Sequence, residues 1–283
     1  MKVLSFGEIL WDVYPDEKHI GGAPLNFAAH FSKQGGEAYM ISALGDDDLG
    51  REALKKLREW KINADRVKIV RDAPTGQCLV TLDKNGVPSY DLLNDVAYDF
   101  IDCGIKGEKF DALYFGTLAL RGGHNMRSIA ELIGNNSFSE IFVDINIRPP
   151  FYSKESILFA LEHATIIKIS EEELPVVMRE ISGGERENAE KAIAERFKNL
   201  KLVIITCGEN GSLAYDARAK KTYRADAEKV SVVNTVGAGD SFSAAFLYGY
   251  LSGESVDECL RRASKLSAYV VSCAEAIPEY DKQ

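Results

Sequence analysis

The sequence lacks the features that mark secreted, zinc-binding or membrane-spanning proteins. Its five cysteines are an odd number, spread from Cys78 to Cys273 with no C-x-x-C pair, so we predict neither a disulfide framework nor a zinc site. No apolar run approaches the ~18 residues of a membrane span. The first residues read directly into a strand pattern rather than a basic and then apolar leader. We therefore expect a cytoplasmic protein.

Basic charge is also scarce. The chain of 283 residues has 34 Lys and Arg against 43 Asp and Glu, a formal net charge of -9. Such a field repels nucleic acid and anionic membranes, so neither is expected as a partner. A local site can still bind an anionic substrate. The 46% of hydrophobic and 27% of charged residues are ordinary for a globular enzyme.

Two common nucleotide-binding motifs are missing. No G-x-x-x-x-G-K-[ST] string of a Walker loop occurs. The string G-A-G-D-S-F begins at Gly237, but it has Phe242 where the dinucleotide fingerprint needs its third glycine. A Rossmann-type dehydrogenase is therefore disfavoured.

Short β-rich runs alternate with helical patterns, which predicts an α/β fold with a mostly parallel sheet flanked by helices. The strands are expected to be covered on both faces because their apolar runs are nearly continuous. The absence of repeats and of long linkers favours one domain over residues 1–283. The expected strands are 2–6, 38–45, 112–120, 140–147, 165–170, 201–208 and 212–217, and the expected helices include 24–36, 46–60, 188–200 and two that start at 241 and 256.

Residues 75–98 break this alternation, because they read as strand, turn and strand with no helix between them. The turn is Asn85-Gly86, a strong hairpin signal between alternating strands. A hairpin inserted in an α/β domain commonly forms a lid or an oligomer contact. The alternative is an antiparallel extension of the main sheet.

The start of the helix near residue 241 is unusual, because small residues and an aspartate precede its apolar run. Small residues there leave backbone N–H groups free at the positive end of the helix dipole, which suits a phosphoryl group. An aspartate in that first turn could act as a base toward a hydroxyl. It could equally be an acidic helix cap, and the string alone does not separate the two readings.

Polar residues follow several of the expected strands. Because ligands of open parallel sheets bind outside the carboxyl ends of the strands, these residues are candidates for a site. No metal-ligand spacing links His19, His30, His124 and His163, so they are assigned no function. The polar strand ends comprise Glu8, Asp12, Asp144, Asn146, Arg148, Lys168, Ser170, Glu173, Thr206, Gly208 and Gly211.

Taken together, the motifs resemble those of the ribokinase-like (PfkB-type) sugar kinases, and most of all the fructokinases. The resemblance runs through nearly the whole chain in order. It is carried by "GGAPLNFAAHFSKQG", "SALGDDDLG", "PTGQCLVTLD", "DINIRP", "KISEEEL", "TCGENGS" and "NTVGAGDSFSAAFLYGYLSG".

The resemblance implies a ribokinase-like α/β domain with a small β-sheet lid, built from segments at about 12–22 and 74–98. It also implies ATP as phosphoryl donor, Mg²⁺ with it, a small-molecule sugar as acceptor, and a homodimer formed through the lids.

By the same resemblance, Asp240 matches the catalytic base, and Gly237, Ala238 and Gly239 match the anion hole. The base would accept the sugar hydroxyl proton during in-line attack on the γ-phosphorus. The other implied positions are Asp12, Gly22, Asn26 and Arg148 for the sugar, Lys168, Thr206, Gly208, Gly211 and Ser264 for the nucleotide, and Ser170 and Glu173 for a metal and phosphate network.

Four positions depart from the common family pattern. Asn234 and Val236 stand where many relatives have aspartate and threonine in a region that binds a monovalent cation, so potassium activation stays open. Ser264 replaces an asparagine beside the adenine. Ser170 replaces the asparagine of an Asn-x-x-E motif, as is usual in fructokinase-like members.

The expected activity is ATP-dependent phosphorylation of fructose. A kinase for another sugar or sugar acid, such as 2-keto-3-deoxygluconate, is the alternative, since Arg148 could also hold a carboxylate. A catalytically silent sugar-sensing relative is a remote alternative, because neither the aspartate nor the glycines of the motif are lost.

Overall fold

The computed structural model describes residues 1–82, 88–184 and 187–280. In this part of the chain, nine strands form one large sheet in the order β13-β12-β11-β10-β9-β8-β1-β4-β5. Neighbouring strands from β5 to β11 run parallel, whereas β12 pairs antiparallel with both β11 and β13. The strands are β1 (Lys2–Phe6), β4 (Glu37–Gly45), β5 (Asn63–Val70), β8 (Lys109–Gly116), β9 (Ser137–Asp144), β10 (Ile166–Ser170), β11 (Leu202–Thr206), β12 (Ser212–Asp216) and β13 (Lys221–Ala225).

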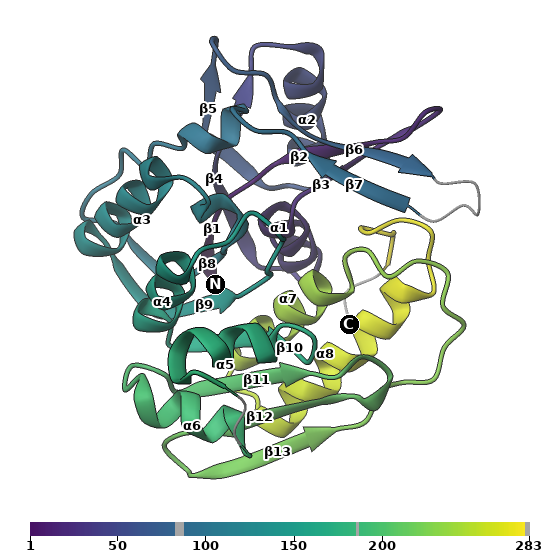
Figure 1. Cartoon of the computed structure of the whole chain (residues 1–283). Helices are drawn as coiled ribbons and strands as arrows, with labels where there is room; N and C mark the ends of the chain where they lie inside the picture. The colour runs from purple at the N-terminus through teal and green to yellow at the C-terminus, as the bar shows by residue number, and fades with distance from the viewer. Residues whose placement is uncertain (83–87, 185–186, 281–283) are drawn as a thin grey trace.

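Helices cover both faces of this sheet (Figure 1). Residues of α1, α2, α7 and α8 belong to one apolar cluster, and residues of α3 to α6 belong to the other. The helices are α1 (Ala23–Lys33), α2 (Asp48–Glu59), α3 (Gly123–Asn135), α4 (Lys154–His163), α5 (Leu174–Ser182), α6 (Ala189–Arg196), α7 (Ala238–Leu251) and α8 (Val256–Val271).

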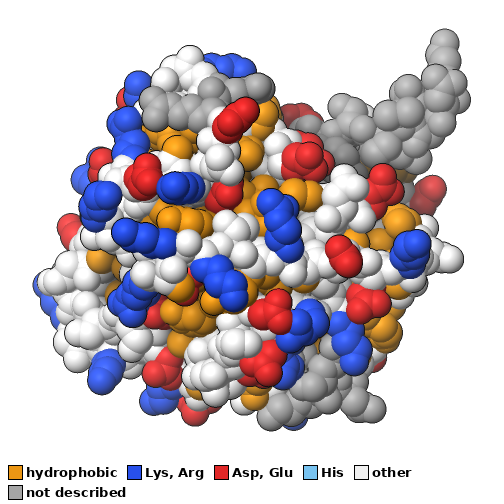
Figure 2. Space-filling view, turned by 90° about the horizontal axis from the view of Figure 1, so that it is seen from below, with side chains coloured by type: hydrophobic (Ala, Val, Ile, Leu, Met, Phe, Trp, Pro, Cys, Tyr) orange, Lys and Arg blue, Asp and Glu red, His pale blue; other side chains and the backbone are white. Residues whose placement is uncertain are grey.

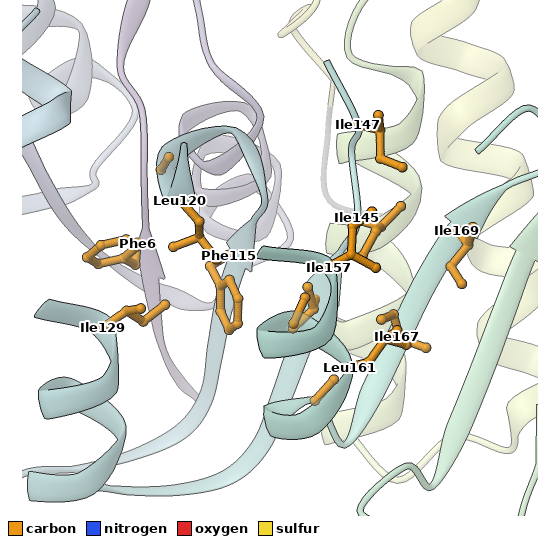
Figure 3. Close-up of a cluster of buried hydrophobic side chains, with 14 of the residues drawn as sticks. Phe6, Phe115, Leu120, Ile129, Ile145, Ile147, Ile157, Leu161, Ile167 and Ile169 are labelled. Carbon is orange, nitrogen blue, oxygen red and sulfur yellow. The ribbon is translucent and has the colours of Figure 1, made fainter. Parts of the chain in front are cut away.

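Consecutive residues of the central strands contribute to opposite clusters, as the two-residue period of a strand requires. Tyr114 and Phe115 of β8 are both fully buried but belong to different clusters, and so do Ile166 and Ile167 of β10. Figure 3 shows the second cluster, where Phe115 and Ile167 lie with side chains from α3 and α4, including Ile129. The expected α/β fold, with a mostly parallel sheet flanked by helices, is confirmed.

A second sheet lies apart from the large one, at the upper right of Figure 1. Its order is β3-β2-β6-β7, with β2 and β6 parallel and the outer pairs antiparallel. The expected hairpin therefore forms β6 and β7 of a separate sheet, not an extension of the main one; its Asn85-Gly86 turn lies outside the described residues. The strands are β2 (Leu10–Val13), β3 (Lys18–Gly21), β6 (Gly76–Leu82) and β7 (Pro88–Leu92).

Some element boundaries differ from those expected. The helix expected from residue 241 begins at Ala238, so Asp240 lies inside its first turn. The strand expected over 112–120 ends at Gly116 and is followed by a short 3₁₀ turn, Leu118–Leu120. β5 and β13 were not expected. Both lie at the edges of the large sheet, where charged residues interrupt the apolar pattern.

The surface of the face seen in Figure 2 carries Lys and Arg side chains interspersed with Asp and Glu. In the described ranges, none of the helices has both the length and the apolar character required to cross a membrane.

Candidate active site

The sheet order brings the polar strand ends together. Strands β1, β8, β9, β10 and β11 are consecutive neighbours and parallel, so their carboxyl ends share one edge of the sheet. At this edge lies a cavity of about 1510 Å³ whose wall also includes residues of the small sheet and the starts of α1 and α7. Every predicted site residue lines it: Asp12, Gly22, Asn26, Arg148, Lys168, Ser170, Glu173, Thr206, Gly208, Gly211, Gly237, Ala238, Gly239, Asp240 and Ser264.

A hydrogen bond between helices α1 and α7 holds the side chain of Asp240 in place. Asn26 on α1 donates a hydrogen bond from Nδ2 to Asp240 Oδ2 at 2.8 Å. Burial and the nearby negative charge of Asp144 raise the pKa of Asp240 to about 6, against the opposing effects of the Asn26 hydrogen bond, Lys168 and Arg148. A carboxylate with such a pKa is ionised at neutral pH and is a stronger base than an ordinary aspartate.

The turn before Asp240 presents free backbone N–H groups. Ala238 N–H donates to Thr235 O at 3.3 Å and Ser241 N–H to Gly237 O at 2.9 Å. The intervening N–H groups of Gly239 and Asp240 have no backbone partner among the described residues. These groups lie at the positive end of the 14-residue helix α7, which is an arrangement that binds anions.

Gly237 fits this turn because its φ is 81°, a left-handed conformation that favours glycine. A Cβ atom at this position would also lie 2.7 Å from the Ala276 carbonyl oxygen. The shape of the turn thus requires glycine on both conformational and steric grounds.

A buried lysine lies beside the turn. Lys168 Nζ contacts Asp144 Oδ1 at 2.9 Å and Oδ2 at 2.7 Å, and a Cβ added at Gly239 would be 3.2 Å from the same Nζ. Although burial acts in the opposite direction, Asp144 and Glu173 raise the pKa of Lys168, so it stays protonated. The site therefore combines free N–H groups with one fixed positive charge.

Glu173 connects the ends of two strands. Its Oε1 accepts from Ile147 N at 2.6 Å and its Oε2 from Ser170 N at 2.8 Å, while Ser170 Oγ accepts from Glu173 N at 3.3 Å. Burial and then Asp144 raise the pKa of Glu173. In the described part of the chain, no group of three His, Cys, Asp or Glu side chains is placed to hold a metal by itself.

The small-sheet end of the cavity is acidic. Asp12 on β2 has a pKa raised by burial, although Cys78, His19 and Arg148 act against this shift. Gly22 directly precedes α1 with a φ of 112°, and a Cβ there would lie 2.4 Å from the Glu8 carbonyl oxygen. Arg148 is exposed, and its Nη1 donates to the Ile147 carbonyl oxygen at 3.4 Å.

Glu8 is a site residue that the motif analysis did not assign, although it was noted at the end of the first strand. It is 1% exposed; its Oε1 accepts from Ala23 N at 3.2 Å, and its Oε2 has no partner in the described structure. Burial raises its pKa to about 7, and Asp240 contributes, whereas the hydrogen bonds from its own and the Ala23 N–H and the charge of Arg148 oppose the shift.

The opposite end of the cavity is formed by the chain after β11 and by α8. Thr206 ends β11, Gly208 begins the 3₁₀ turn Gly208–Asn210, and Ser264 is a buried residue of α8. The exposed apolar side chains of Val230 and Val232 also line this end. These two valines were not predicted from the sequence, where their signal is the short apolar run "VSVV" in a polar segment.

The chain belongs to the pfkB carbohydrate kinase family, whose family model matches residues 7–283. It is an ATP-dependent sugar kinase. The predicted family and the predicted sugar kinase activity are thereby confirmed, whereas fructose as the substrate stays a prediction.

Its similarity to individual family members is moderate. The chain is 27% identical to a probable fructokinase-2 of Arabidopsis thaliana, over 96% of this chain and 88% of the relative. It is 28% identical to a 5-dehydro-2-deoxygluconokinase of Listeria innocua, over 94% of this chain and 85% of the relative. These two relatives act on different substrates by name.

Solved structures share the fold. A fructokinase from Vibrio cholerae O395, solved with fructose, ADP and calcium ion, superposes with a TM-score of 0.82 at 20% identity, covering 98% of this chain and 94% of the other. An aminoimidazole riboside kinase from Salmonella enterica superposes with a TM-score of 0.81 at 21% identity, covering 98% and 95%.

Replacing Glu8 with Gln should change how stability depends on pH. The unfolded carboxyl loses its proton near its ordinary pKa of 4.5, whereas the folded one keeps it until about 7. The native state therefore binds more protons in this window, and wild-type stability falls as pH rises through it. Relative to wild type, Glu8→Gln should gain up to about 3 kcal/mol of unfolding free energy between about pH 4.5 and pH 7.

Urea unfolding at the two pH values measures this difference. Glu195→Gln, at an exposed position on α6, should follow wild type. A Glu8→Gln protein that follows wild type at both pH values would contradict the raised pKa.

Proposed function

We propose that this sugar kinase phosphorylates D-fructose, with Asp240 as the catalytic base. The observation that carries the catalytic assignment is the partly buried carboxylate of Asp240, which Asn26 holds beside N–H groups at the start of α7 that have no backbone partner among the described residues. A sugar hydroxyl placed against Asp240 gives up its proton to Oδ1 or Oδ2 as its oxygen attacks the γ-phosphorus, and ADP leaves as the bond from that phosphorus to the bridging oxygen breaks. Because the transition state of phosphoryl transfer is loose, positioning and charge stabilisation supply most of the catalysis.

The N–H groups of the Gly237–Gly239 turn and of Asp240 would stabilise the negative charge on the oxygens of the transferred phosphoryl group. Donors fixed before the reaction need no reorganisation when charge develops, which makes them effective. Lys168 adds a positive charge on the same side, since its Nζ lies next to Gly239. Thr206, Gly208, Gly211 and Ser264 would contact the nucleotide.

Mg²⁺ is proposed to accompany ATP. Mg²⁺ in kinases is usually bound by one or two carboxylates, several waters and the substrate phosphates, rather than by a complete protein cage. The cavity fits this mode because it offers the carboxylate of Glu173 beside Ser170 but no three-residue ligand group in the part of the chain described. Glu173 and Ser170 would hold the ion through water, and the ion would neutralise phosphate charge. Activation by potassium stays open, because Asn234 and Val236 depart from the common family pattern.

The acidic lining favours a neutral sugar. Glu8, Asp12 and Asp240 line the cavity, and Arg148 opposes the pKa shifts of all three. Lys168 also opposes the shift of Asp240, and His19 that of Asp12. Carboxylates accept hydroxyl hydrogen bonds but repel a sugar acid. The fructokinase relatives support fructose, whereas the 5-dehydro-2-deoxygluconokinase relatives, at similar identity, support a sugar acid held by Arg148 as the second candidate. 2-Keto-3-deoxygluconate belongs to this second class.

The small sheet is proposed to act as a lid on one domain of residues 1–283. Asp12 lies on β2, so motion of this sheet would carry a sugar contact toward or away from Asp240. Closure would exclude water and limit ATP hydrolysis. A dimer through the outer face of the lid, where Leu79 is exposed, is part of the same proposal.

Asp240→Asn should fold normally and lose most turnover. The amide keeps the shape of the side chain but cannot accept the proton, so kcat should fall by roughly 10²–10⁴-fold. Coupled assay of ADP release with fructose and ATP measures this. Asp257→Asn is the matched control and should keep wild-type kcat, because Asp257 lies in the first turn of α8 and does not line the cavity. Near-wild-type turnover of Asp240→Asn would exclude it as the base.

A substrate panel with ATP decides between the two sugar classes. We expect the highest kcat/KM for fructose, and weaker activity on sugar acids, aldohexoses and nucleosides. Arg148→Gln should then leave the KM for fructose within about tenfold of wild type, since the loss of a single exposed charged contact costs at most about 1.4 kcal/mol. Preference for a sugar acid, lost in Arg148→Gln, would establish the second candidate instead.

A further inference from the structure

His30 is a fully buried histidine that the proposed chemistry does not use. It lies on α1, one helical turn after Asn26. Its Nε2 is 2.9 Å from the Ala276 carbonyl oxygen and its Nδ1 is 2.6 Å from the Tyr280 hydroxyl. Burial lowers the pKa of His30 to about 4, the Ala276 hydrogen bond opposes this, and Lys33 adds to it, so the ring is neutral at physiological pH.

Its two partners fix the tautomer of the neutral ring. A carbonyl oxygen can only accept, so Nε2 must carry the proton and donate to Ala276. Nδ1 is then the acceptor and the Tyr280 hydroxyl donates to it. Both ring nitrogens are therefore satisfied, and both hydrogen bonds end on the same short segment.

That segment, residues 274–280, is called here the C-terminal strap. It leaves the end of α8 and is tied to α1 at further points: Lys33 Nζ contacts Glu279 Oε1 at 2.9 Å, and its charge lies 5.4 Å from the centre of the Tyr280 ring. The Tyr269 hydroxyl of α8 donates to the Glu279 carbonyl at 2.8 Å.

The strap lies directly behind the anion-binding turn. A Cβ at Gly237 would meet the Ala276 carbonyl oxygen at 2.7 Å and the Ala276 Cβ at 3.0 Å, so Gly237 packs against the residue that His30 holds. The start of the strap is tied to the segment before the turn as well, because Asn234 Nδ2 donates to the Ala274 carbonyl oxygen at 2.8 Å. Movement of Ala276 would therefore be transmitted to the turn.

We propose that His30 is a positioning residue for phosphoryl transfer, which holds the Gly237–Gly239 turn in place through the Ala276 carbonyl. The inference rests on the proposed role of that turn as the phosphate site. One helix then fixes both halves of the reacting centre, because Asn26 holds the base and His30, four residues later, holds the support of the anion site. A fixed spacing between these halves is what in-line transfer requires.

Two substitutions at this position separate the hydrogen bond from the packing. His30→Phe keeps a flat ring against Tyr280 but removes both hydrogen bonds. His30→Gln offers an amide N–H toward Ala276 in place of Nε2–H. Tyr280→Phe is a milder variant that removes only the hydroxyl donor. The matched control is His163→Phe, which loses a 2.9 Å histidine contact to the Phe159 carbonyl on α4, outside the cavity wall.

Two readouts are needed, and one of them does not depend on the reaction. Hydrogen exchange of the backbone amides of residues 236–241 in the ligand-free enzyme should become faster in His30→Phe, return toward wild type in His30→Gln, and stay unchanged in His163→Phe. Steady-state kinetics should show kcat reduced roughly tenfold or more in His30→Phe, because sub-ångström displacement of transition-state donors is costly. The KM for the sugar should stay within about twofold, since its contacts lie elsewhere. Tyr280→Phe should fall between wild type and His30→Phe.

Each result decides the inference. Faster exchange with lower kcat, rescued by Gln, supports it. Unchanged exchange, faster exchange with wild-type kcat, or equal losses in Phe and Gln would overturn it. If His30→Phe does not fold, Tyr280→Phe and His30→Gln carry the same comparison. The Asp240→Asn assay tests the proposed function separately, because retained activity there would not alter the exchange result.

Discussion

The hydrogen bond between Asn26 and Asp240 is the contact on which the rest of the site depends. It joins the first turn of α1 to the first turn of α7, two helices separated by more than 200 residues of sequence. Both helices begin at the same edge of the sheet, where their dipoles concentrate positive potential. A carboxylate buried there needs such donors, because burial alone would favour its neutral form.

Two buried charges of opposite sign are paired at this edge of the sheet. Asp144 is paired with Lys168, and the Ser243 hydroxyl also contacts Asp144, at 3.2 Å. Asp144 raises the pKa of Asp240 whereas Lys168 lowers it, so the pair that brings a positive charge to the phosphate side also acts on the basicity of the proposed base. Removing one partner of such a pair leaves an uncompensated charge, which is strongly destabilising. The electrostatics of the site are therefore coupled to the stability of its strands.

The sequence was sufficient for the fold class and the family, and every site residue that it predicted lines the cavity, because these follow from local patterns and ordered motifs. Edge strands were missed because Asn63–Val70 and Lys221–Ala225 carry charged residues among their apolar ones. The start of α7 was misplaced because glycine is a poor helix former, although Ala238 and Gly239 are helical here. Glu8 and His30 could not be assigned because their partners, Ala23 and Ala276, are brought to them only by the fold. The roles of the cavity residues stay predictions.

The most direct test of the account is the pH dependence of kcat/KM for wild type and for Glu8→Gln. If Asp240 is the base, kcat/KM falls on the acid side with an apparent pKa of about 6, since the protonated carboxyl cannot accept the hydroxyl proton. The acid limb should persist in Glu8→Gln. Glu8 is the other carboxyl with a pKa near neutral, so a limb that remains without it is assigned to Asp240. A flat profile down to about pH 5 would contradict the account, as would loss of the limb in Glu8→Gln.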